Sequence, residues 1–219
     1  MRFSSVELQK VATTQIDYLR EHTSYGRHID GLRQVMSAAV FRAESLQFTE
    51  GEIPLLAVVP LSIFGPAVQM QTVYRSGMGG NSYIKQGDVT DRYLVSVEPY
   101  FAIKVRTGFE LVANDSGQAQ SGVMAIAKCQ GYPLTCAENI ALATQYHYLF
   151  TAQPNWLGTG AIGSMVRGRE DCFPVIGLTH YDAPLMEEKR LDQVLPGISF
   201  PSCWARVGRS EQLEFNLEG

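Results

Sequence analysis

The chain has 219 residues, of which 45% are hydrophobic and 18% charged, and its formal net charge is −4. This apolar fraction excludes a disordered chain, and the acidic balance argues against a nucleic-acid-binding protein, which needs a surplus of lysine and arginine to replace phosphate counterions. The length fits one large domain, or one domain with a helical extension.

Residues 1–49 have the pattern of two amphipathic helices joined by a short turn. Ser4 and Glu7 form a capping-box pattern that marks a helix start, and the stretch 24–26 interrupts the helical pattern. Two apolar stripes recur at helical spacing on either side of this break: Leu8, Ala12, Ile16 and Leu19, then Ile29, Leu32, Val35, Met36, Ala39 and Val40. We expect a helical hairpin whose stripes are buried against the rest of the chain or against a partner, followed by a core domain over residues 50–219.

Residues 53–74 carry no charge, which raises the question of a membrane span. Pro54, Pro60 and Pro66 would break a spanning helix, so we expect no membrane contact. The pattern favours a buried strand over residues 55–59, ended by Pro60. A short helix should begin near Pro66, because proline suits the first turn of a helix.

The rest of the chain alternates turns with short apolar runs. Thr135 and Glu138 form a second capping box, which predicts a helix running to about Phe150. Another helix is expected from residue 115 or 116 to about 129, and a solvated helix or loop at 187–190. Strands are expected over residues 93–97, 161–166, 173–179 and 203–207. Because helices cluster early and strands late, the predicted class is α+β, with an N-terminal helical hairpin followed by a mixed sheet with packed helices.

The four cysteines, Cys129, Cys136, Cys172 and Cys203, form no Cys-x-x-Cys pair, so we expect reduced, buried thiols and no metal. Gly-Thr-Gly-Ala-Ile-Gly at 158–163 fits a dinucleotide fingerprint, but no long helix is expected after it. The favoured interpretation is a glycine-rich loop leading into a strand, and no cofactor is predicted. Charges throughout the first thirty residues argue against a signal peptide and favour a cytoplasmic location.

One set of residues combines the side-chain types of a catalytic site. His180 and Asp182 are two positions apart, so on a strand both would point to one face, where Asp182 would orient the imidazole. A cysteine would then supply the thiolate. Eight residues of extended strand, at about 3.3 Å each, separate Cys172 from His180, so Cys203 is the better candidate, provided that its strand pairs alongside. The alternative is buried thiols and a surface histidine with an acidic neighbour.

A second set suggests an anion pocket. Arg167, Arg169 and Arg206 lie in or beside the late strands, next to Ser164 and Ser202. Arginine side chains and hydroxyl groups together can bind a carboxylate or a phosphate. The alternative is a pair of exposed arginines that form surface ion pairs with neighbouring acidic residues.

Several short motifs resemble an uncharacterised bacterial family that is common in actinobacteria. They are Pro-Leu-Leu-Ala-Val-Val-Pro at 54–60 with Gln-Met at 69–70, Tyr-Leu-Val-Ser-Val at 93–97, Tyr-Pro-Leu-Thr at 132–135 with Glu138, Gly-Ser at 163–164, and Ser-Cys at 202–203 with Arg-Val at 206–207. The resemblance covers most of residues 50–208, while the loop at 183–200 departs from it. It implies a shared fold and brings no activity.

The sequence contains no complete catalytic constellation, so we expect a non-catalytic binding or interaction protein. A homodimer or another protein partner would dock through the N-terminal helices. The first alternative is a cysteine-dependent hydrolase or transferase that uses Cys203 or Cys172 with His180 and Asp182. The second is an anion- or nucleotide-binding module around Arg167, Arg169 and Arg206.

Overall fold

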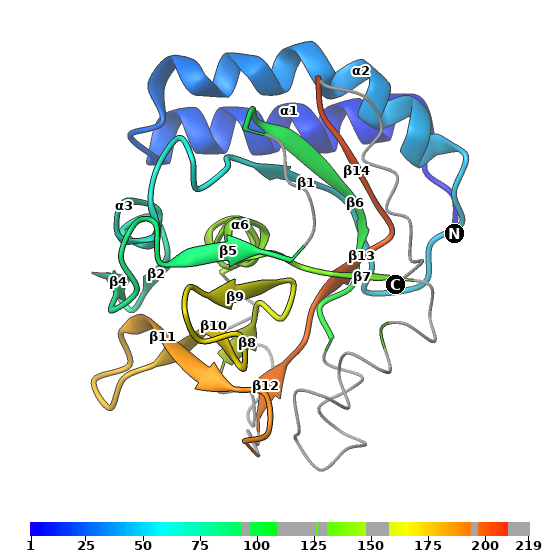
Figure 1. Ribbon diagram of the computed structural model, residues 1–219. Helices are drawn as coiled ribbons and strands as arrows, with labels where there is room; N and C mark the ends of the chain where they lie inside the picture. The colour runs from blue at the N-terminus through cyan, green and yellow to red at the C-terminus, as the bar shows by residue number, and fades with distance from the viewer. Residues whose placement is uncertain (93–96, 109–125, 127–130, 148–157, 194–196, 210–219) are drawn as a thin grey trace.

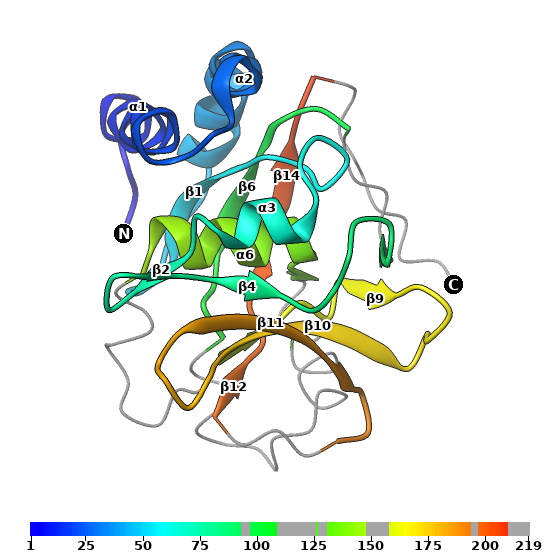
Figure 2. The same cartoon turned by 90° about the vertical axis from the view of Figure 1, so that its left-hand side faces the viewer.

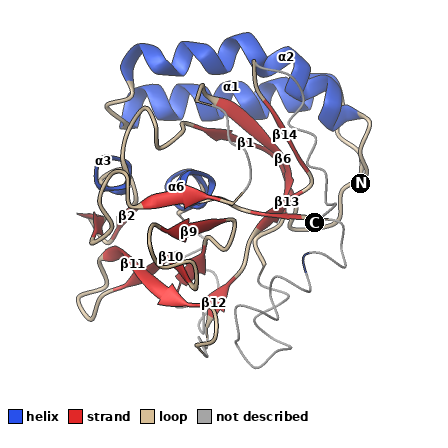
Figure 3. Ribbon diagram, in the orientation of Figure 1, coloured by secondary structure: helices blue, strands red, loops and turns tan. Residues whose placement is uncertain are grey.

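The computed structural model describes residues 1–92, 97–108, 126, 131–147, 158–193 and 197–209. The fold is α+β, as predicted, and its elements form four layers (Figures 1 and 2). A pair of helices covers a three-stranded sheet, and a second helical layer separates this sheet from a five-stranded one. Figure 3 shows the same separation of helices and strands.

The N-terminal helices form the predicted hairpin. α1 (Ser5–His22) begins with the Ser4–Glu7 capping box and is joined to α2 (Asp30–Glu44) by a short 3-10 helix, Gly26–Ile29. Both predicted stripes are buried, apart from the partly buried Met36. They share one core cluster with the first sheet, so the apolar faces of the hairpin are covered by the chain itself.

The first sheet has the strand order β1-β6-β14, with β1 (Ile53–Val58), β6 (Tyr100–Val105) and β14 (Ala205–Val207) all antiparallel. On β1, Leu55 and Ala57 pack with the hairpin, whereas Leu56 and Val58 pack with the helix on the opposite face. Burial on both faces explains the continuous apolar run that predicted this strand. The central strand β6 was not predicted.

The helix α6 (Cys136–Gln145) lies between the two sheets. It begins at the predicted Thr135–Glu138 capping box, and it ends at Gln145 rather than Phe150 because Tyr146 leaves the helical conformation. Every residue from 136 to 144 is buried. The short helix α3 (Pro66–Met70) lies in the same layer and begins at Pro66, as expected.

The second sheet has the strand order β12-β8-β10-β11-β4. These strands are β4 (Asn81–Ser82), β8 (Gly158–Gly160), β10 (Cys172–Leu178), β11 (Pro184–Arg190) and β12 (Ile198–Ser199). The strand predicted over 173–179 is confirmed. The helix or loop predicted at 187–190 is wrong, because these polar residues pair along β10 as part of β11. Cross-strand pairing overrides their local preference.

The other described strands form two-stranded ribbons: β2 (Tyr74–Arg75) with β3 (Met78–Gly79), β5 (Val89–Asp91) with β9 (Ser164–Val166), and β7 (Tyr132–Pro133) with β13 (Ser202–Cys203). The strand predicted over 203–207 is thus divided at Trp204 between β13 and β14. The strand predicted over 161–166 covers only 164–166, and the first glycines of the 158–163 motif lie in β8 instead of a loop. A Cβ at Gly160 would meet the rings of Phe173 and Phe200 at 2.8 and 2.9 Å, so this glycine allows close packing.

Two other predictions fall on residues outside the described ranges. These are the strand at 93–97, except Val97, and the helix up to 129, except Ile126. Among the helices of the described residues, none combines the length and the apolar character needed to cross a membrane.

Candidate functional site

The candidate site is built around a carboxylate at the end of β5. The antiparallel pairing of β5 with β9 places Asp91 opposite Ser164. The Ser164 hydroxyl donates a hydrogen bond to Asp91 Oδ1, and its oxygen accepts one from the backbone N–H of Cys136 at 2.8 Å. Through these two hydrogen bonds Ser164, which is completely buried, links the Asp91 carboxylate to the first turn of α6.

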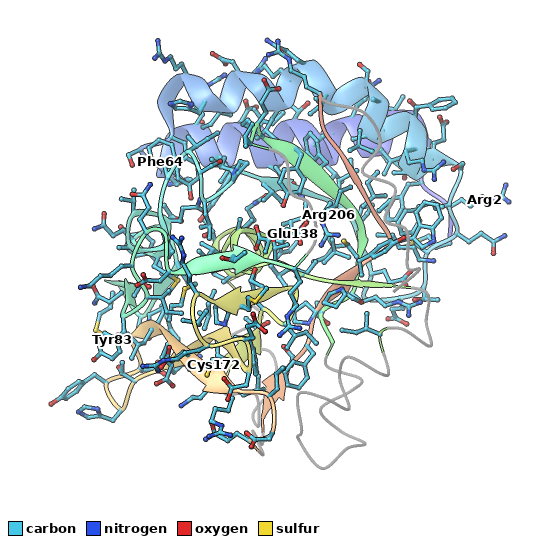
Figure 4. The ribbon with its side chains drawn as sticks, in the orientation of Figure 1. Arg2, Phe64, Tyr83, Glu138, Cys172 and Arg206 are labelled. Atoms are coloured by element: carbon cyan, nitrogen blue, oxygen red, sulfur yellow. The ribbon has the colours of Figure 1, made fainter. Side chains whose placement is uncertain are left out.

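A buried ion pair lies close to this carboxylate. Arg206 Nε donates to Glu138 Oε1 at 2.5 Å, and Arg206 Nη2 donates to Glu138 Oε2 at 2.8 Å. The Tyr100 hydroxyl also donates to Glu138 Oε1, at 3.1 Å. Neither charged side chain has exposed surface. Figure 4 shows Glu138 and Arg206 between the N-terminal helices and the second sheet.

The start of α6 fixes Glu138 in this position. Glu138 is the third residue of the helix, and its Oε2 accepts the backbone N–H of Thr135 at 2.7 Å. Arg206 comes from β14 and also donates to the carbonyl of Pro133 at 2.9 Å. The capping residue predicted from the sequence therefore has a second role, since it joins α6 to the first sheet through a charged contact.

The surroundings of Asp91 change its acidity. Burial raises the pKa of Asp91 to about 6, from 3.8 for a free side chain. The hydrogen bond from Ser164 and the charge of Arg206 act in the opposite direction, and the charge of Glu138 adds to the increase. At neutral pH the carboxylate is therefore mostly ionised although it is largely removed from water.

Asp91 lines a cavity of about 340 Å³. Its walls come from the segment after β1, from the start of α3 and from the segment that leads into β5. Pro60, Leu61, Pro66 and Val89 give the walls apolar surface, and Ser62 and Gln86 add neutral polar groups. The cavity lies at the small end of the range for ligand sites, and a pocket that combines apolar walls with a few placed polar groups is typical of small-molecule sites.

The structure places the proposed cysteine nucleophile and its histidine on different elements. Cys203 lies in β13, which pairs with β7, whereas His180 lies in the connection between β10 and β11. The alongside pairing that the hypothesis requires is not formed between these described strands. Burial raises the pKa of Cys203 to about 12, the opposite of what a reactive thiolate needs.

Asp182 interacts with another hairpin. Its Oδ2 accepts hydrogen bonds from Arg75 Nε at 2.7 Å and from the Ser76 hydroxyl at 3.2 Å. The His180 ring lies against Tyr181, with ring centroids 3.7 Å apart. Cys172 begins β10, at the end of the strand far from His180, and burial raises its pKa as well. Cys172 and His180 thus lie at opposite ends of β10, as predicted.

The five residues of the predicted anion pocket do not share one environment. Arg167 and Arg169 are exposed after β9, and Arg169 forms an ion pair with Glu188. Arg206 is buried with Glu138, and Ser202 is buried in β13. Ser164 contacts the carboxylate of Asp91 instead of an anion. Two of the five residues, Ser164 and Arg206, are thus brought near one another by their shared neighbour Asp91.

Sequence reasoning missed Asp91 and Tyr100. Asp91 follows a short run of mixed polarity, and its burial depends on pairing with residues more than seventy positions away. Tyr100 lies in the unpredicted strand β6. The only local signal for the network was the Thr135–Glu138 capping box.

Among the described residues, no group of three or more His, Cys, Asp and Glu side chains is arranged to hold a metal ion. Comparison of the chain with protein-family models, with curated proteins and with solved structures finds no match. The resemblance to an actinobacterial family stays a prediction.

Proposed function

We propose that this protein is a non-catalytic small-molecule-binding protein whose ligand occupies the cavity beside Asp91. The observation that carries the proposal is a largely buried carboxylate at the wall of a cavity whose described lining holds no other charge and has both apolar and polar surface. Such a cavity buries the body of a ligand, and the carboxylate orients it through a hydrogen bond.

The support behind Asp91 suits a binding site. Ser164 and the first turn of α6 hold the carboxylate, and the Glu138–Arg206 pair links that turn to the first sheet. A polar group held by buried neighbours loses little freedom on binding, which favours affinity.

Binding is favoured over catalysis by the composition of the cavity. Among the described residues that line it, Asp91 is the only titratable side chain. General acid–base and nucleophilic mechanisms commonly need a second group with a complementary role. The reduced cysteines Cys136, Cys172 and Cys203 agree with a cytoplasmic setting, which we propose together with this function.

The proposal does not depend on a partner for the N-terminal helices. Their predicted apolar stripes are buried within the chain, and the large apolar side chains that α1 and α2 expose are Val6 and Phe41. A homodimer through these helices stays a prediction, and light scattering tests it.

A blocked-cavity variant tests the proposed function. Ser62 is an exposed residue at the cavity, so Ser62→Trp places an indole at its mouth. Val68→Trp, on the exposed side of nearby α3, is the matched control outside the lining. A thermal-shift screen of small neutral, cationic and anionic compounds should give ligands that raise the melting temperature of wild type and Val68→Trp but not of Ser62→Trp. Equal shifts in both variants, or no shift with any compound, would refute the proposal.

A further inference from the structure

Among the described residues, no cation forms an ion pair with Asp91, so its negative charge has no counter-charge of its own. Glu138 from α6 and Arg206 from β14 act on Asp91, but they form an ion pair with each other. Tyr100 on β6 and Cys136 on α6 also interact electrostatically with Asp91, and burial raises the pKa of both, so they are neutral near pH 7. Ionised Asp91 is therefore the charge that a ligand meets.

The hydrogen bonds of Asp91 leave acceptor positions for a ligand. A carboxylate has about four acceptor positions, and the described residues supply one hydrogen bond, from Ser164 to Oδ1. An ammonium group offers three N–H donors and a positive charge. A hydroxyl group offers one donor without charge, and an anionic group would be repelled.

The strength of the charge interaction depends on burial. Opposite charges attract more strongly in a partly buried site than in bulk water, where solvent screens them. An ionised carboxylate in a partly buried site has lost most of the water that stabilised its charge. A bound cation compensates for this loss more fully than a neutral hydrogen-bond donor does. The apolar walls formed by Leu61, Pro66 and Val89 fit the hydrocarbon part of such a ligand.

We propose that the Asp91 cavity selects ligands that carry an ammonium group on a compact apolar body. This specificity rests on the function proposed above, because it concerns the same cavity. It goes further by naming the chemical class of the ligand and the residue that discriminates it.

Three probes of nearly equal size and different charge test the specificity: benzylamine, benzyl alcohol and benzoate. Their affinities are measured by calorimetric titration at about pH 8, where the amine is still cationic. Benzylamine should bind at least about tenfold more tightly than benzyl alcohol, and benzoate should not bind. Asp91→Asn keeps the shape of the side chain and should remove the advantage of the amine.

A pH series and a charge control complete the experiment. As pH falls through about 6, Asp91 becomes protonated, so the preference for benzylamine should disappear by about pH 5. Asp192→Asn removes a carboxylate from the exposed surface and should leave the preference unchanged, which separates the cavity from general attraction to an acidic protein.

Failure of the specificity can be distinguished from failure of the proposed function. If benzyl alcohol binds as tightly as benzylamine and Ser62→Trp abolishes both, the cavity binds ligands but does not select ammonium. If benzylamine binds Ser62→Trp as well as wild type, it lies outside the cavity and the specificity is overturned. Absence of benzylamine binding at millimolar concentration, or a preference retained by Asp91→Asn, also overturns it.

Discussion

The Arg206 guanidinium and the Glu138 carboxylate meet through two hydrogen bonds, at 2.5 and 2.8 Å, in a position where neither side chain has exposed surface. Removing one partner leaves the other charge buried, and this typically costs about 3–5 kcal/mol. We expect Glu138→Gln and Arg206→Met each to lower the free energy of unfolding by an amount in that range. Urea denaturation measures it.

The double variant and a surface pair provide controls for this ion pair. Glu138→Gln combined with Arg206→Met should destabilise less than the sum of the single changes, because no unpaired charge stays in the core. Arg20 pairs with Asp30 where the side chains are 46% and 60% exposed, so Arg20→Met should cost about 1 kcal/mol or less. An equal loss of unfolding free energy at the buried pair and at the exposed pair would contradict the idea that burial makes the first pair important.

Asp91 should make the stability of the ligand-free protein depend on pH. Its pKa is about 6 in the folded protein against 3.8 for a free side chain, so the folded state binds this proton more tightly than the unfolded chain. Ionisation of Asp91 therefore lowers the free energy of unfolding. This loss is absent when the pH is below the pKa of the unfolded chain and grows as pH rises between the two pKa values. It is complete above the pKa of the folded protein, where it amounts to about 3 kcal/mol.

Asp91→Asn should therefore gain stability relative to wild type as pH rises from about 4 to about 7.5, by about 3 kcal/mol. Denaturation of both proteins across this range measures the difference. A difference that does not change with pH would show that the carboxylate is not held in the environment described here.

Replacing Gln15 should destabilise the protein more than replacing an exposed polar residue of α1. In the described part of the chain β1 is an edge strand, and the Gln15 amide donates to the carbonyl of Leu55 at 2.6 Å and accepts the N–H of Ala57 at 2.7 Å. Gln15→Ala would leave both backbone groups buried without these partners, at a cost of about 2 kcal/mol or more. Gln9→Ala, at an exposed position of the same helix, should change stability little.

Cys136 and Cys203 should be unreactive in the native protein. Burial raises the pKa of Cys203 to about 12 and also raises the pKa of Cys136 well above its usual value, so the thiolate is scarce at neutral pH. Iodoacetamide labelling followed by peptide mass spectrometry should modify these two residues only after denaturation. Labelling of native Cys203 faster than free cysteine would restore the hypothesis of a cysteine nucleophile.

The parts of the fold that could be predicted are those with local signals. Both capping boxes, both helical stripes and the strand after Pro54 depend on residues within a few positions of one another. The strand β11 could not be predicted in the same way, because its sequence Glu-Glu-Lys-Arg is polar and its conformation comes from pairing with β10.

The candidate site was less predictable for the same reason. Ser164 and Arg206 were selected as polar residues in late strands, but the expected partner was an anion, whereas the structure gives them Asp91 and Glu138. Their meeting depends on the pairing of β5 with β9 and of β14 with β6. Sequence spacing contains no direct information on such pairings.

The position of α6 has a consequence for unfolding. From Cys136 to Thr144 the helix has no exposed residue, because one side packs on the first sheet and the other on the second. A short helix of this kind has little stability by itself. Neither sheet can separate from it without exposing its apolar surface, so we expect the described layers to unfold in a single cooperative transition.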